Sequence, residues 1–158
     1  MKLLKITLGL ALSLLTLSVY AQARAEPTES ERIMRSMIQL QAALSLKKGL
    51  SEDPNCSKNK YPSISIDDYI NLMIKMEEKD GKKSSATPSK LAETKDMLTQ
   101  MVDVQIPNQG VAWKVHYESM NKAISSSSKV SGDQLCNAVN TASEGLFQKS
   151  MDNLRLIK

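Results

Sequence analysis

The spacing of apolar residues along this chain is helical almost everywhere, and this feature restricts the fold more than any other. In the segment 28–48, Ile33, Met37, Leu40 and Leu44 follow one another at steps of four and three, which places them on one face of a helix. No stretch alternates apolar and polar residues with the period of two that a half-buried strand requires, and no Asn-Gly hairpin signal is present. We therefore predict an all-α protein.

Capping residues and helix breakers divide this pattern into about five helices, which we expect to form a small bundle. Thr28 and Glu31 make a capping box at the start of the first helix, and Gly49 is expected to end it. Met34 and Ile38 are expected to widen its buried face. The later helices are expected to begin at the N-caps Ser65 and Thr87, near Val111, and at a second capping box in 131–134.

The segments between these helices carry turn residues. Residues 51–64 contain two prolines and are expected to form a loop, and residues 80–87 are expected to be a linker. Pro107 is expected to close the third helix, and 108–110 reads as a turn. Gly145, inside the last helix, is expected to mark a bend or a close crossing of another helix.

The two cysteines, Cys56 and Cys136, are expected to form one disulfide bond. The alternative is a reactive thiol, but the chain has no CxxC motif and neither cysteine has a neighbouring histidine. The bond would connect the loop after the first helix to the first turn of the last helix. For a closed loop of this length, the chain-entropy model gives a stabilisation of about 4–5 kcal/mol.

The first residues of the chain have the three-part layout of a secretory signal peptide. Lys2 and Lys5 precede an apolar run over 6–19, and the small residues Ala21 and Ala23 follow it. We predict cleavage after Ala23, so that 1–23 is the signal peptide and 24–158 is a single helical domain in the periplasm or the secreted space. The alternative, an uncleaved membrane anchor, is disfavoured because a span needs about 20 apolar residues. No later stretch is apolar enough to span a membrane, and a single bridge is more typical of a bacterial periplasmic protein than of a cysteine-dense animal one.

The charge balance argues against nucleic acid as a partner. The predicted signal peptide holds two of the 21 basic residues and none of the 17 acidic ones, so its removal lowers the net charge from +4 to +2. Nucleic-acid binding needs a concentrated basic face, and the basic residues of this chain do not cluster.

The sequence contains no pattern that predicts catalysis, a cofactor or a metal site. His116 is the sole histidine, and its spacing places it on or beside a buried helix face. The carboxylate pairs 67–68 and 77–78 are adjacent along a helix, so their members do not face each other. No Gly-rich phosphate loop, EF-hand or dinucleotide fingerprint is present. We therefore predict a non-enzymatic protein without a cofactor.

Methionine is the one compositional anomaly. Six of the nine methionines form pairs at helical spacing: Met34 with Met37, Met73 with Met76, and Met97 with Met101. They could fill an irregular core, form an adaptable protein-binding surface, or bind Cu(I) through their thioethers.

Our leading functional hypothesis is an exported protein that binds a protein partner, as an inhibitor, an immunity factor or an accessory subunit. Copper handling through the paired methionines and a holdase-type chaperone are the alternatives. The loop 51–64 and the linker 80–87 are the first places where we would expect an interface.

Overall fold

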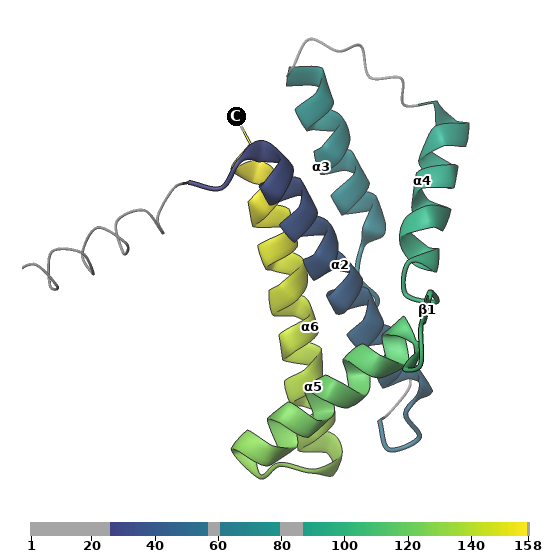
Figure 1. The fold of residues 1–158 in the computed structure, drawn as a ribbon, viewed down its shortest axis with the longest axis vertical. Coiled ribbons are helices and arrows are strands. Elements are labelled where there is room, and N and C mark those ends of the chain that lie inside the picture. Colours follow the sequence, from purple (N-terminus) through teal and green to yellow (C-terminus); the bar gives the residue numbers. More distant parts are fainter. Residues whose placement is uncertain (1–25, 57–60, 80–86, 158) are drawn as a thin grey trace, which may run out of the picture.

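The structure is a computed structural model that describes residues 26–56, 61–79 and 87–157. The described residues form a bundle of helices with one short hairpin, which confirms the all-α prediction (Figure 1). The predicted signal peptide 1–23, residues 57–60 of the predicted loop and most of the linker 80–87 lie outside them. The elements are α2 (Glu29–Glu52), α3 (Ile66–Lys79), α4 (Pro88–Gln100), β1 (Gln105–Ile106), β2 (Gly110–Val111), α5 (Ala112–Ser128) and α6 (Gly132–Arg155).

The two longest helices, α2 and α6, are antiparallel and form the centre of the bundle (Figure 1). Small side chains allow them to approach closely: Ser36 and Ala43 of α2, and Ser143 and Ser150 of α6, are fully buried. The Ser143 hydroxyl donates to the Ala43 carbonyl at 2.9 Å, and the Ser36 hydroxyl donates to the Ser150 carbonyl at 2.8 Å. These hydrogen bonds satisfy buried hydroxyls that would otherwise destabilise the interface.

The apolar core consists of two clusters, and α2 and α6 contribute to both. In Figure 1, α3 and α4 lie towards one end of the central pair and α5 crosses the other end. The first cluster therefore joins α2 and α6 to α3 and α4, through Leu40, Tyr69, Ile70, Leu98, Met151 and Leu154. The second joins them to α5, through Leu46, Leu50, Cys56, Tyr117, Cys136 and Val139.

Three of the four predicted caps form as expected. Thr28 and Glu31 make the full capping box of α2, and the Thr87 hydroxyl caps α4, whose first residue is a proline. The Ser65 hydroxyl accepts from the Asp68 amide at 3.3 Å. The capping box predicted for α6 is wrong: Ser131 is the N-cap, but its side chain makes no capping hydrogen bond. The chain enters α6 through Gly132 at φ +55°, in the left-handed region that favours glycine.

Two expectations for α2 are wrong. Gly49 does not end the helix, which continues to Glu52, because Gly49 is buried against the ring of Tyr117 from α5. A Cβ at this position would lie 2.1 Å from Tyr117 Cγ, so only glycine permits this approach. Met34 and Ile38 are not buried either: their side chains are 62% and 59% exposed, because no described helix covers that part of α2.

Gly145 was expected to mark a bend or a close crossing, and the crossing is absent. Apart from the backbone of its own helix and its chain neighbours, no described atom lies within 4 Å of the position that its Cβ would occupy, and Gly145 is exposed within α6. Gly145 therefore has no packing reason in the structure.

The chain between α4 and α5 differs from the prediction. The helix ends at Gln100, well before Pro107, and a small antiparallel hairpin follows in which Gln105 pairs with Val111 and Ile106 with Gly110. Strands of two residues are too short to show a period-two pattern. The turn predicted at 108–110 is present, with positive φ at Asn108 and Gly110.

Within the described part of the chain, no helix has the length and apolar character needed to span a membrane.

Candidate functional site

The predicted disulfide bond between Cys56 and Cys136 is present, with a Cα–Cα distance of 5.8 Å. It joins the loop after α2 to the first turn of α6, as the sequence indicated. Both sulfurs are buried in the second core cluster, beside Leu46 and Tyr117. The pair therefore has a structural role.

The residues considered for catalysis are spread over the fold. His116 is half-buried on α5, and Asp67 forms an ion pair with Lys95 at 2.9 Å on the exposed side of α3. Asp68 follows the Ser65 cap, where the helix dipole favours a carboxylate. Among the described residues, no three His, Cys, Asp or Glu side chains are grouped so that they could hold a metal ion.

The methionine pairs have different environments. Met73 and Met76 of α3 pack against the first core cluster, as does Met101. Met97, one turn before Met101, is 56% exposed, and Met34 on α2 is also exposed. Thus only part of the methionine excess fills the core, and the Met97–Met101 pair lies at the boundary between core and surface.

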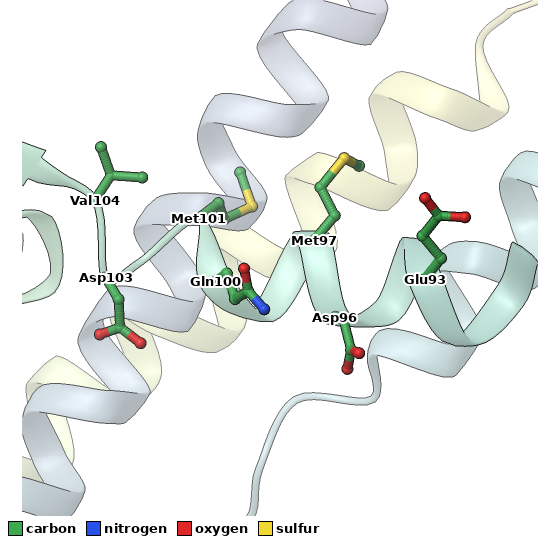
Figure 2. Close-up of a pocket in the computed structure, with 7 residues that line it drawn as sticks. All are labelled: Glu93, Asp96, Met97, Gln100, Met101, Asp103 and Val104. Atoms are coloured by element: carbon green, nitrogen blue, oxygen red, sulfur yellow. The ribbon is translucent and has the colours of Figure 1, made fainter.

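A groove of about 660 Å³ lies on the surface of α4 and the segment that follows it. Figure 2 shows Met97 and Met101 projecting to the same side of α4, with Val104 beyond the end of the helix. Val104 is 55% exposed, so two of these three apolar side chains are more than half accessible. Isolated exposed apolar residues are ordinary, but a group that lines a groove is typical of a binding surface.

Carboxylates surround this apolar strip. Glu93, Asp96 and Asp103 also line the groove, together with Gln100 (Figure 2). Glu93 and Asp96 make no ion pair with another described residue, whereas Asp103 pairs with Lys48 of α2 at 2.5 Å. The groove therefore has an apolar strip and a negatively charged rim.

The groove is held in place by contacts with the bundle. Leu98 and Val102 are buried on the inner side of this segment. The Gln41 side chain donates to the Met101 carbonyl at 2.8 Å, which ties the end of α4 to α2. The Ala112 amide donates to the Val104 carbonyl at 2.8 Å and thereby ties the hairpin to α5. A surface fixed in this way loses little conformational freedom when a partner binds.

Sequence reasoning found this surface only in part. The Met97–Met101 pair was singled out, and an adaptable binding surface was one of its three interpretations. Val104 carries no sequence signal, because its exposure depends on the hairpin. Of the segments favoured as interfaces, 51–64 is described except for 57–60, and 80–87 is described only at residue 87; no described residue of either segment lines the groove.

Comparisons with known proteins add no assignment. No protein-family model matches the chain, and neither a curated protein nor a solved structure shows significant similarity to it.

Proposed function

We propose that this protein is an exported, non-enzymatic binding protein, and that the groove on α4 receives a cationic amphipathic segment of a partner protein. The observation that carries the proposal is the combination of exposed Met97 and Val104 with the carboxylates Glu93 and Asp96 in one groove. The predicted signal peptide and the disulfide bond support a site of action outside the cytoplasm.

The apolar strip favours a peptide or helix face as ligand. Methionine side chains are unbranched and polarisable, so they adapt to the shape of a bound apolar side chain. Recognition of an amphipathic helix in an apolar groove needs a few anchors spaced by one turn, and Met97 and Met101 have this spacing.

The charged rim favours a basic segment over an acidic one. Opposite charges around an interface raise the association rate and exclude partners of the wrong sign. Glu93 and Asp96 make no ion pair within the described chain, so they can pair with lysine or arginine of the partner without breaking an existing contact.

An uncovered stripe on α2 gives the partner room beside the groove. Met34 and Ile38 lie on the same side of α2 as Gln41, at intervals of four and three residues. Because Gln41 bonds to the Met101 carbonyl, this stripe runs towards the end of α4 that carries the groove. An extended partner segment can therefore contact both helices.

The test compares capture of the native partner by the wild type, by a variant with a changed groove and by a control variant changed elsewhere on the surface. Met97→Gln together with Val104→Gln makes the groove polar, and Leu156→Gln changes an equally exposed apolar residue at the end of α6, outside the groove and the α2 stripe. We expect a stoichiometric partner that is captured by the wild type and by Leu156→Gln, and lost with the groove variant. Retention of the same partner by the groove variant would exclude this site.

A second measurement tests the predicted charge of the partner. A synthetic amphipathic helix of leucine and lysine should bind the wild type in a titration, and an otherwise identical leucine–glutamate helix should not. Glu93→Gln with Asp96→Asn should weaken the lysine peptide by about fivefold, because rim ion pairs contribute up to about 1 kcal/mol together. Equal binding of both peptides would indicate a holdase-type chaperone, which selects apolar character alone.

Copper handling remains the second candidate, because Met97 and Met101 present their thioethers to the same side of α4 (Figure 2). Soft thioethers bind Cu(I), although one pair supplies only two ligands. A Cu(I) competition titration of the wild type and of the double variant Met97→Leu with Met101→Leu tests whether this pair binds copper. Loss of Cu(I) affinity in the variant would support copper handling by this pair, and unchanged affinity would exclude it.

A further inference from the structure

A second hollow, of about 330 Å³, lies between the end of α2 and the first turns of α5. It is separate from the groove on α4, and its walls carry a different combination of groups. Trp113 and Tyr117 supply aromatic surface, and Glu52, Asp53 and Glu118 supply carboxylates. The volume is at the lower limit for small-molecule sites, which suits a compact ligand or a single long side chain.

The charge of this hollow is negative. Three carboxylates line it, but only one ammonium group, that of Lys114, does so. Lys114 pairs with Glu118 at 3.8 Å, but both side chains are more than half exposed, and such surface pairs contribute little. Glu52 is exposed and makes no ion pair with another described residue. The chain as a whole has a positive net charge, whereas this hollow is negatively charged because carboxylates lie around its aromatic rings.

Asp53 is held in its ionised form. Burial disfavours its charge, but hydrogen bonds from the Asn55 backbone, the Tyr117 hydroxyl and the Asn55 side chain outweigh burial and lower the pKa of Asp53. The Asn55 amide donates to Asp53 Oδ1 at 2.8 Å, and the Tyr117 hydroxyl donates to Asp53 Oδ2 at 2.8 Å. Burial raises the pKa of the Tyr117 hydroxyl to about 12, so this hydroxyl stays protonated and neutral beside the Asp53 carboxylate.

The aromatic wall already attracts a cation from the protein itself. Lys48 Nζ lies 6.0 Å from the centroid of the Trp113 ring, within the range of cation–π attraction. The same ammonium pairs with Asp103 of the groove on α4, so Lys48 lies between the two surfaces. The Trp113 side chain is half-buried, and its remaining surface lines the hollow.

The frame of the hollow is rigid. Gly49 allows Tyr117 to pack directly on the α2 backbone, and the bond between Cys56 and Cys136 holds the short loop that carries Asp53. Cys56 Sγ lies 3.6 Å from the Tyr117 hydroxyl, so the disulfide and the aromatic wall are in contact. A preformed site of this kind binds a small ligand without a large ordering cost.

We propose that this hollow is a binding site for a primary alkylammonium group, with the alkyl stem against Trp113 and the ammonium towards Glu52, Asp53 and Glu118. Aromatic rings with carboxylates select a cation over a neutral ligand. The carboxylate oxygens accept hydrogen bonds, which favours an ammonium that carries N–H donors over a quaternary one. The proposal does not depend on the groove on α4 or on its partner.

The test uses n-butylammonium, with n-butanol as the neutral analogue of the same shape. Trp113 is the single tryptophan of the chain, so its fluorescence reports directly on this hollow. We expect a saturable change with n-butylammonium that n-butanol does not produce, and weaker binding of tetramethylammonium. Equal binding of the alcohol, or no saturable response to n-butylammonium, would overturn the proposal.

Variants locate the response. Glu52→Gln with Glu118→Gln removes two exposed charges from the hollow and should weaken n-butylammonium about fivefold to tenfold, as two ion pairs of about 0.5–0.7 kcal/mol each imply. Glu93→Gln in the groove on α4 is the matched control and should leave the affinity unchanged. An unchanged affinity in the double variant would exclude the hollow as the site.

A lysine derivative distinguishes the two sources of such a group. N-acetyl-lysine methylamide resembles a lysine side chain of a protein partner, whereas n-butylammonium resembles a free amine. Tighter binding of the lysine derivative would assign the hollow to a side chain of a partner, and equal or weaker binding would assign it to a small free amine. Either result supports a primary ammonium as the recognised group.

Discussion

At the scale of single residues, Gly49 shows how one missing side chain determines a helix contact. The residue has ordinary helical geometry, and its importance lies in the Tyr117 ring, which occupies the place of a Cβ. Tyr117 in turn donates to Asp53, which lines the hollow proposed as an ammonium site. The contact between α2 and α5 therefore affects both stability and the shape of that hollow.

Two glycine variants test this contact. We expect Gly49→Ala to lower the free energy of unfolding by about 1–3 kcal/mol, because overpacking outweighs the better helix propensity of alanine. Gly145→Ala in α6 is the control: it has open space around it, and we expect a gain of about 0.5–1 kcal/mol. Urea unfolding followed by circular dichroism measures both. A Gly49→Ala protein as stable as the wild type would mean that Tyr117 can move away without cost.

At the scale of elements, α2 and α6 have equal length but begin differently. Both span 24 residues, and both have a hydroxyl residue at the N-cap. Only Thr28 of α2 accepts a hydrogen bond from a helix amide, and the residue after Ser131 is Gly132 with a left-handed φ. The same sequence signature therefore gives a full capping box in one helix and none in the other.

Because only one of the two N-cap residues bonds to its helix, replacement of each by alanine should change the free energy of unfolding by different amounts. We expect Thr28→Ala to cost about 1 kcal/mol of unfolding free energy and Ser131→Ala at most a few tenths, since the Ser131 hydroxyl makes no capping bond. Thermal and urea unfolding of the two variants measure the difference. Equal losses would show that Ser131 caps α6 in solution.

The Thr28 contribution should also depend on pH. Hydrogen bonds from the Thr28 backbone and side chain lower the pKa of Glu31 below its ordinary value of 4.5. A carboxyl with a lowered folded-state pKa contributes stability above its unfolded pKa and loses it as the pH falls through the folded value. The difference between wild type and Thr28→Ala should therefore narrow below about pH 4.

At the scale of the whole molecule, the disulfide bond connects parts of the chain that are far apart in sequence. Its cysteines are 80 residues apart in sequence and both belong to the second core cluster, whereas the first cluster contains no disulfide bond. Its loss should therefore weaken the α5 end of the bundle more than the end formed with α3 and α4.

Replacement of both cysteines by alanine tests this difference. We expect a loss of about 4–5 kcal/mol in the free energy of unfolding, according to the chain-entropy model for a loop of this length. Hydrogen exchange should show faster opening at Tyr117 and Val139 than at Tyr69 and Leu154. Reductant should destabilise the wild type and leave the double variant unchanged. An unchanged urea midpoint for the reduced wild type would contradict the expected role of the bond.

Some features follow from the sequence alone. Local signals determine where α2, α3 and α4 begin, because caps act within one turn of the chain: Thr28, Ser65 and Thr87 needed no tertiary information. The disulfide pairing followed from the presence of only two cysteines. The burial of Leu40 followed from helical periodicity, since residues at steps of three and four share a face.

Other features were decided by the tertiary structure. Periodicity shows which side chains share a face, but not how far a neighbouring helix covers it, so Met34 and Ile38 were wrongly placed in the core. Gly49 continues α2 because a ring from α5 packs on it, and a local pattern contains no information about that ring. Val104 became part of a groove through a hairpin whose strands are too short to leave a pattern. The hollow proposed as an ammonium site lies where α2 and α5, which are distant in sequence, meet, and such a cavity depends on how the helices cross.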